Sequence, residues 1–321
     1  MKLRCAILDD YQGVSLDMAD WAQVLPEVEV QVFREKIDGI DNLVCALKDF
    51  EILCLMRERT PMPSMLIEAL PKLRLIMSTG GQNLSIDVAA ANKRDITVCG
   101  TSALPHPTVE LNFALMLELA RHAGRESDGM HNGKLWQDSV GMDLCGKTLG
   151  IIGLGRLGGK VAEIAKAFGM KVIAWSPNLT QEKCVEAGVG YATKEQVFRD
   201  ADIVSLHMQL SAGTRHIIDA AELALMKRGA LLINTSRGPL INEAALLDAL
   251  RKGAIAGFGV DVYDEEPLPA DHPFRTLPNV VMTPHIGFVT VDNYRTYYGG
   301  AVEGIRAWID GKPIRVAKTA T

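Results

Sequence analysis

Three short segments in the second half of the chain each follow an apolar run and carry an ionisable side chain. They place Arg237, Glu266 and His285 directly after stretches that we interpret as strands. In an open α/β sheet, ligands bind beyond the carboxyl ends of the strands. These three side chains are therefore expected at one site.

An arginine, a carboxylate and a histidine in one site suit hydride transfer to the C2 atom of a 2-oxo acid. The planar guanidinium binds the substrate carboxylate with two hydrogen bonds. The carbonyl oxygen gains negative charge and needs a proton donor near neutral pH, which histidine supplies. A carboxylate beside that histidine raises its pKa and orients its ring.

Taken one at a time, the three residues have plainer interpretations. Arg237 precedes a glycine and suits a helix start or a surface position. Glu266 precedes a proline and suits a solvated turn, and His285 suits a loop position with its hydrogen bonds satisfied. Their joint occurrence after a nucleotide-binding motif favours the catalytic interpretation.

That motif is a glycine pattern between an apolar run at residues 148–152 and a helical pattern at 156–168. Gly153, Gly155 and Gly158 fit G-x-G-x-x-G. The first glycine permits a tight turn, the second lets a pyrophosphate approach the backbone, and the third lets the helix pack closely on the strand. The N–H groups at the helix start then bind phosphates. The strand–turn–helix context predicts a bound dinucleotide.

The end of the next strand, residues 171–175, leaves the choice between NAD and NADP open. In an NAD site an acidic residue about 20 residues past the motif binds the ribose 2′-hydroxyl, whereas Ser176 stands here. No carboxylate repels a 2′-phosphate, but no arginine stands at 176–180 to attract one, and Lys183 is the nearest cation. We expect NAD or NADP, with a slight lean to an NADP-tolerant site.

Strand–helix alternation along the chain predicts an α/β fold of two Rossmann-like doubly wound parallel-sheet domains with a cleft between them. The predicted strands cover residues 4–8, 28–33, 52–56, 73–77, 96–98, 148–152, 171–175, 202–206, 231–234, 255–260 and 280–282. The predicted helices cover residues 16–22, 41–48, 64–70, 86–92, 108–123, 156–168, 180–187, 194–199, 220–226, 242–251 and 291–310.

The nucleotide sheet is complete without the last helix, so the tail is expected to return to the first domain. The prediction is a flavodoxin-like, substrate-binding domain of residues 1–103 plus 291–321. Residues 104–290 are predicted to form an NAD(P)-binding Rossmann domain.

Composition narrows the class of protein. The 321 residues are 48% hydrophobic and carry a net charge of −5 without a basic tract, so we expect no nucleic-acid or membrane partner. No apolar run of about 18 residues predicts a membrane span, and the chain enters a strand without a signal region. The six cysteines form no C-x-x-C pair and are expected to be reduced in a cytoplasmic protein. No metal site is predicted.

Four motifs in order resemble the D-isomer-specific 2-hydroxyacid dehydrogenases, which include phosphoglycerate, glyoxylate/hydroxypyruvate and D-lactate dehydrogenases. The motifs are Gly153-x-Gly155-x-x-Gly158, Asn234-Thr235-Ser236-Arg237-Gly238, Asp261-Val262-x-x-x-Glu266-Pro267 and Pro284-His285-Ile286-Gly287. The similarity covers nearly the whole chain.

The resemblance implies that Arg237 binds the substrate and that Glu266 pairs with His285, the acid/base. Cofactor-binding residues implied by it are Gly153, Gly155, Arg156, Leu157, Gly158, Ser176, His207, Thr214, Thr235, Ser236, Asp261 and Gly287. Asp261 would hold the nicotinamide carboxamide. Substrate-binding residues would be Arg57, Gly80 and Gly81, the glycines lying in a loop at 78–82 whose N–H groups help hold the carboxylate. The implied partners are a small 2-oxo or 2-hydroxy acid and a second copy, in a homodimer formed through the nucleotide domain.

Two departures from the family pattern bear on the substrate. Phosphoglycerate enzymes tend to carry arginine where Ser78 stands, which weakens that assignment. Phe288 occupies a position that is usually small, and it either narrows the cleft or packs at the hinge. A corepressor-like, catalytically silent dinucleotide-binding regulator is the alternative function, which the intact Arg237, Glu266 and His285 set argues against. A formate dehydrogenase is disfavoured because the expected N-terminal extension is missing.

Overall fold

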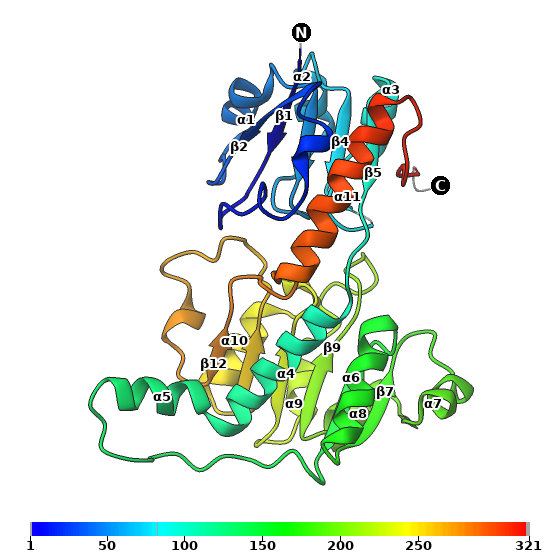
Figure 1. Ribbon diagram of the computed structural model, residues 1–321. Helices are drawn as coiled ribbons and strands as arrows, with labels where there is room; N and C mark the ends of the chain where they lie inside the picture. Colours follow the sequence, from blue (N-terminus) through cyan, green and yellow to red (C-terminus); the bar gives the residue numbers. More distant parts are fainter. Residues whose placement is uncertain (1, 82, 319–321) are drawn as a thin grey trace. The chain divides into compact units, whose positions relative to one another are not determined.

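The computed structural model describes residues 2–81 and 83–318, which divide into two compact units (Figure 1). One, called here the terminal unit, comprises Met1–Leu104 and Val289–Thr321; the other, the central unit, comprises Pro105–Phe288. Gln82, part of the expected substrate loop, lies outside the described residues. Within the described ranges, no helix has the length and apolar character needed to cross a bilayer.

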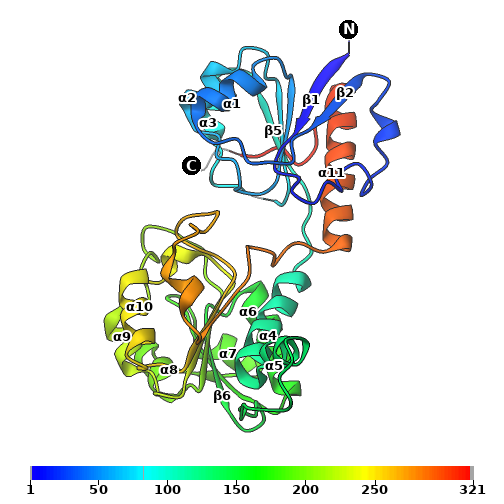
Figure 2. The ribbon, with the colours of Figure 1, turned by 90° about the vertical axis from the view of Figure 1, so that its left-hand side faces the viewer.

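The terminal unit is built on a parallel sheet of order β2-β1-β3-β4-β5, the flavodoxin-like order. Its strands are β1 (Leu3–Ile7), β2 (Val28–Val32), β3 (Ile52–Leu55), β4 (Leu75–Ser78) and β5 (Thr97–Gly100). Its helices are α1 (Ile40–Leu47), α2 (Ser64–Ala69), α3 (Val88–Lys93) and α11 (Val291–Ile309). Helices α1–α3 cover one face and α11 the other (Figure 2). Strands β3 and β4 are buried at every position, as expected where helices cover both faces.

The central unit is built on a second parallel sheet, of order β12-β11-β10-β9-β6-β7-β8. Its strands are β6 (Thr148–Ile152), β7 (Lys171–Trp175), β8 (Gly190–Tyr191), β9 (Ile203–Leu206), β10 (Leu231–Asn234), β11 (Gly257–Val260) and β12 (Val280–Met282). Its helices are α4 (His106–Arg121), α5 (Ala123–His131), α6 (Arg156–Ala167), α7 (Gln181–Ala187), α8 (Lys194–Asp200), α9 (Ala220–Leu225) and α10 (Glu243–Arg251). All described strand pairs in both sheets are parallel, which confirms the predicted fold class.

The central sheet determines where ligands bind. Strand β6 pairs with β7 on one side and with β9 on the other, so the strand order reverses at β6. Helices α8–α10 cover one face and α4 and α6 the other (Figure 2). A crevice at such a reversal, beyond the carboxyl ends of the strands, is the usual ligand site of this architecture.

The helix predicted at residues 16–22 does not form; only a 3₁₀ turn, Trp21–Gln23, is present. The carboxylate of Asp10 accepts hydrogen bonds from the N–H groups of Val14 (3.1 Å) and Ser15 (2.9 Å). The indole N–H of Trp21 donates to the Ser15 carbonyl (2.9 Å). These side chains satisfy the backbone locally, and such bonds compete with a helical ladder.

One α-helix and one strand were not predicted. Helix α5 has no buried residue, so its sequence lacks the apolar periodicity from which a helix is recognised. Its start is fixed by the Glu118 carboxylate, which accepts from the N–H groups of Gly124 (2.7 Å) and Arg125 (3.3 Å). Strand β8 is only 2 residues long and depends on pairing with β7.

Candidate active site

His285 and Glu266 form a hydrogen-bonded pair in the central unit. Glu266 follows β11 and His285 follows β12, and 2.6 Å separates His285 Nδ1 from Glu266 Oε2. The other carboxylate oxygen accepts the N–H of Tyr263 (2.9 Å). Burial opposes ionisation of Glu266, but the hydrogen bond and charge of His285 hold the pKa of this carboxyl below its ordinary value. Glu266 is therefore a carboxylate that orients His285.

The turn that carries His285 is held by a buried carboxylate. Asp261 Oδ1 accepts from Thr283 Oγ1 (2.6 Å) and the Ile286 N–H (2.8 Å), and Oδ2 accepts from the Gly287 N–H (2.8 Å). Burial holds the pKa of Asp261 above its ordinary value, although these hydrogen bonds lower it in part. His285 has a φ of 52°, a left-handed conformation that costs energy in a residue other than glycine. The three bonds to Asp261 hold the turn in this conformation.

The two aromatic neighbours of this turn complete its support. The Tyr263 hydroxyl donates to the Thr283 carbonyl (2.8 Å). The ring of Phe288 is buried and meets the His285 imidazole edge-on, with 5.5 Å between ring centroids. Phe288 thus packs against the ring of His285.

Arg237 lies in the turn after β10, beside the Glu266 loop. Asn234 holds this turn by donating to the Arg237 carbonyl (2.9 Å). Nη1 of Arg237 donates to the Ser236 carbonyl (2.7 Å). A Cβ at Gly238 would overlap the Tyr263 carbonyl group, so a glycine lets the two loops touch. The charge of Arg237 also lowers the pKa of Glu266. The fold thus brings Arg237 close to the pair of Glu266 and His285.

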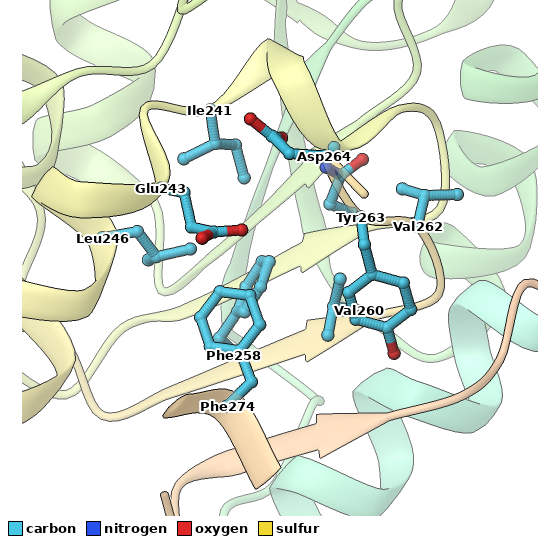
Figure 3. A pocket seen from close by; sticks show the side chains of 11 residues that line it. Ile241, Glu243, Leu246, Phe258, Val260, Val262, Tyr263, Asp264 and Phe274 are labelled. Carbon is cyan, nitrogen blue, oxygen red and sulfur yellow. The ribbon is translucent and has the colours of Figure 1, made fainter. Parts of the chain in front are cut away.

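A pocket of about 240 Å³, counting its solvent-open part, lies behind these loops (Figure 3). The rings of Phe258 and Phe274 lie together in it, 5.6 Å apart, and the carboxylates of Glu243 and Asp264 face it. Arg237, Glu266 and His285 do not line it. It lies behind the loops that carry these three side chains, which are called here the reactive loops.

The three motif glycines have separate reasons to be glycine. Gly153 has a φ of 104°, and a Cβ there would lie 2.6 Å from the His207 carbonyl oxygen. A Cβ at Gly158 would overlap the Gly153 carbonyl oxygen, so the close packing of α6 on β6 requires its absence. A Cβ at Gly155 would meet no described protein atom within 4 Å, so the fold itself does not require that glycine. Helix α6 also begins without a side-chain cap. Both observations fit a dinucleotide pyrophosphate held at this helix start.

Other residues implied by the resemblance lie in the segments after β7, β9 and β10 and at the start of α6. Ser176 Oγ accepts the Leu154 N–H (3.0 Å), which ties the end of β7 to the turn. Ser236 Oγ donates to the Leu206 carbonyl (2.8 Å) at the end of β9. Thr214 Oγ1 donates to the Gln209 carbonyl (2.7 Å) and so shapes the loop after β9. Helix α6 begins with Arg156, which is exposed, and continues with Leu157, which is half-buried.

Sequence reasoning missed a buried polar network at the ends of β9 and β10. Asn112 Nδ2, from α4, donates to Ser205 Oγ (2.8 Å) and approaches Thr235 Oγ1 at 3.4 Å. Ser205 Oγ lies 2.9 Å from His207 Nε2. Burial lowers the pKa of His207 to about 4. The available signal was Asn112 itself, a polar residue on the buried face of an apolar helix.

The substrate residues implied for the terminal unit lie together after β3 and β4. Arg57 has a φ of 54°, and a Cβ at Gly80 would overlap its guanidinium. The glycine therefore lets the arginine cross the loop. The Gly80 N–H, expected to hold a substrate carboxylate, instead donates to Thr101 Oγ1 (2.8 Å). The Thr79 N–H donates to the Leu55 carbonyl (3.0 Å). Both N–H groups are therefore already hydrogen-bonded to protein acceptors. Gly81, in the described part of the same loop, has open space around it.

The chain is similar to known proteins along most of its length. Residues 113–287 match the family model described as D-isomer specific 2-hydroxyacid dehydrogenase, NAD binding domain. The chain is 39% identical to a glyoxylate reductase of Aeropyrum pernix over 77% of this chain and 76% of that protein. It is 36% identical to a hydroxypyruvate reductase of Thermotoga maritima over 87% of this chain and 91% of that protein.

A solved structure is similar over its full length. It is a phosphoglycerate oxidoreductase from Vibrio cholerae, with a TM-score of 0.91 and 35% identity. The similarity covers 96% of this chain and 99% of that one.

Proposed function

Because this chain belongs to the family of D-isomer-specific 2-hydroxyacid dehydrogenases, we propose that it interconverts a small D-2-hydroxy acid and its 2-oxo acid. In this proposal Arg237 holds the substrate carboxylate, and His285 with Glu266 is the acid/base pair. The observation that carries the assignment is the 2.6 Å hydrogen bond between His285 Nδ1 and Glu266 Oε2.

The pairing determines which nitrogen of His285 reacts. Nδ1 donates to the Glu266 carboxylate, so Nε2 is the nitrogen left to face the substrate. In reduction, Nε2 gives its proton to the carbonyl oxygen as C2 receives a hydride. In oxidation, Nε2 takes that proton back from the hydroxyl group. Glu266 keeps its charge throughout and stabilises the protonated imidazole.

Arg237 supplies orientation and charge. Its guanidinium can bind both oxygens of a carboxylate, which fixes C2 relative to His285. Asn234 and Gly238 hold the turn that carries it. We propose that Arg57 and the Gly81 N–H also bind the substrate, and that Gly80 contributes by leaving room for the Arg57 side chain.

The dinucleotide supplies the hydride when it is bound. We propose that the turn at Gly155 and the uncapped start of α6 hold its pyrophosphate. Ser176 Oγ already accepts the Leu154 N–H, which leaves the hydroxyl proton free to donate to a ribose hydroxyl or a 2′-phosphate. The site is proposed to accept NAD or NADP, with a slight lean to NADP tolerance.

The direct test is loss of absorbance at 340 nm on mixing the protein with 2-oxo acids and each reduced cofactor. Glyoxylate, hydroxypyruvate, pyruvate and phosphohydroxypyruvate form the panel. We expect turnover with the small acids. The phosphorylated acid is expected to be poorer because Ser78 replaces an arginine. Dinucleotide binding without turnover on any acid would instead indicate the regulator.

Gly155→Ala is expected to weaken dinucleotide binding by roughly tenfold or more without lowering the unfolding temperature. The added methyl group meets no described protein atom within 4 Å but occupies the approach of the pyrophosphate. Gly159→Ala is the matched control, because a Cβ there also meets nothing within 4 Å. Titration of cofactor fluorescence and thermal unfolding measure the two quantities. Equal affinity in the two variants would contradict the proposed phosphate site.

We propose that the protein is a homodimer formed through the central unit. The segment after α5 exposes Leu135 (94%), Trp136 (70%) and Val140 (96%), an apolar group typical of an interaction surface. Trp136→Ser is expected to shift the protein from dimer to monomer in size-exclusion chromatography with light scattering. Val185→Ser, on another exposed apolar residue (71%), should leave the mass unchanged. A monomeric wild type would contradict the proposal.

The six cysteines are unpaired thiols. Disulfide-free proteins are usual in reducing compartments, and we propose a cytoplasmic location.

A further inference from the structure

A buried polar cluster links α4 to the carboxyl ends of β9 and β10. Asn112 and Ser205 are fully buried in it, and the proposed function gives neither of them a role. They contact His207 and Thr235, two residues in the proposed dinucleotide site. The inference below rests on the proposed function only in taking a dinucleotide as the ligand.

The orientation of the Asn112 amide can be decided by comparing its two alternatives. As described, Nδ2 donates to Ser205 Oγ and approaches Thr235 Oγ1, and Oδ1 is buried without a hydrogen-bond partner among the described residues. A flipped amide would leave both N–H protons of Nδ2 buried where Oδ1 now lies. Unpaired buried N–H groups are rarer in proteins than under-used carbonyl oxygens, so the described orientation is favoured.

That orientation determines where Ser205 sends its single proton. Because Asn112 Nδ2 can only donate, Ser205 Oγ accepts from it. The remaining neighbour of the hydroxyl is His207 Nε2 at 2.9 Å. If Nε2 carried a proton, Ser205 would accept twice and its own buried O–H would have no partner. The arrangement that pairs every proton has Ser205 donating to Nε2.

His207 therefore carries its proton on the other nitrogen. A neutral imidazole has one N–H, and burial lowers the pKa of His207 to about 4, so the ring is neutral at pH 7. Among the described residues, no protein group is hydrogen-bonded to Nδ1. The carbonyl of the same residue packs against Gly153, which places His207 at the glycine turn.

We propose that Asn112 is a positioning residue, which through Ser205 keeps the His207 proton on Nδ1 and so presents a neutral N–H donor to the bound dinucleotide. The same amide donates to Thr235 Oγ1 at 3.4 Å. Because that oxygen accepts from Asn112, the hydroxyl proton of Thr235 points toward another acceptor. One buried side chain on α4 thereby determines the hydrogen-bonding polarity of two residues on the central sheet.

The test is ¹⁵N–¹H correlation NMR of the histidine side chains in the full-length protein without dinucleotide, at pH 7. The chain has 7 histidines, and His207→Gln identifies the His207 signals by their loss. The expected wild-type spectrum has a protonated, pyrrole-type Nδ1 and a hydrogen-bonded, pyridine-type Nε2. A wild-type His207 protonated on Nε2 would overturn the inference whatever the variants do.

Two variants remove the relay in different places. Asn112→Leu removes the donor to Ser205 while keeping the branched shape of the side chain, and Ser205→Ala removes the hydroxyl. In both, the proton is expected to redistribute toward Nε2, which a free imidazole prefers. Met116→Leu is the control, because Met116 lies one turn along the same buried face of α4 and takes no part in the relay. An unchanged Nδ1–H form in both folded relay variants would contradict the role of Asn112.

Dinucleotide affinity provides a second measurement. With only a fraction of His207 in the donating form, the Kd for the reduced cofactor is expected to rise roughly fivefold in Ser205→Ala. A changed tautomer with an unchanged Kd would refute the donor role. If the wild type binds no dinucleotide, the proposed function fails, while the spectrum of the protein alone still tests the relay.

Discussion

His285→Ala is expected to lower kcat for 2-oxo acid reduction by about 10²–10⁴-fold, the usual contribution of a positioned acid/base group. Dinucleotide affinity should be unchanged, because His285 is not among the residues proposed to bind the cofactor. Steady-state kinetics and cofactor titration measure the two effects separately.

The chain offers a second hydrogen-bonded pair of the same kind as a matched control. His272 Nε2 lies 3.0 Å from Glu243 Oε1, and Glu243 lines the pocket behind the reactive loops. His272→Ala removes a histidine from a similar pair but should leave kcat within a few-fold of wild type. Wild-type turnover in His285→Ala, or equal losses in the two variants, would refute the assignment of His285.

Glu266→Gln tests the other member of the pair. The variant keeps a hydrogen-bond acceptor for His285 Nδ1 but loses the charge that stabilises the protonated ring, so kcat should fall by less than in His285→Ala. Burial raises the pKa of Glu266, but His285 lowers it further, leaving it below its ordinary value. A carboxyl with a lowered folded pKa stabilises the protein above its unfolded pKa of about 4.3. This stability is lost as the pH falls through the lower folded pKa, and Glu266→Gln should flatten that part of the acid unfolding curve.

Arg237→Ala is expected to raise KM for the 2-oxo acid by roughly 10–150-fold, which corresponds to losing about 1.5–3 kcal/mol of charged hydrogen bonding. The main effect should fall on KM because the guanidinium holds the carboxylate in the ground state as well as the transition state. Arg237→Lys should lie between the alanine variant and wild type, since an ammonium keeps the charge but not the planar fork.

Arg199→Ala is the control for Arg237, because it removes an exposed arginine from α8, away from the reactive loops. Its KM should match wild type. An Arg237→Ala enzyme with an unchanged KM would mean that the substrate carboxylate is bound elsewhere, and the role of Arg237 would have to be reassigned.

The parts of the site that sequence could predict are those carried by local pattern. The motif predicts a tight turn at Gly153 and a close helix–strand contact at Gly158, and a Cβ at either position would overlap neighbouring atoms. Gly155 has open space around it, and its role in phosphate binding stays a prediction. The carboxyl ends of the strands could be located because each apolar run stops where its strand leaves the buried sheet.

Local pattern was insufficient where side chains replace or extend backbone pairing. Asp10 accepts the N–H groups of Val14 and Ser15, directly before residues 16–22, and so holds that segment in a turn instead of the predicted helix. Glu118 starts α5, a helix with no apolar face for a pattern to reveal. Asp261, which is predicted to hold the nicotinamide carboxamide, has a second role that no pattern indicated: its two oxygens accept three hydrogen bonds from the turn at 283–287.

The sequence by itself determined that the central sheet is followed at three strand ends by Arg237, Glu266 and His285, and that a glycine turn precedes them. Periodicity and glycine spacing are properties of neighbouring residues, so they can be read along the chain. Only the tertiary structure decided what holds those side chains: Asp261 reaching 26 residues onward to Gly287, and Asn112 reaching 93 residues onward to Ser205. Such partners are chosen by the packing of α4 and the loops on the sheet, and no local pattern encodes which distant donor meets which acceptor.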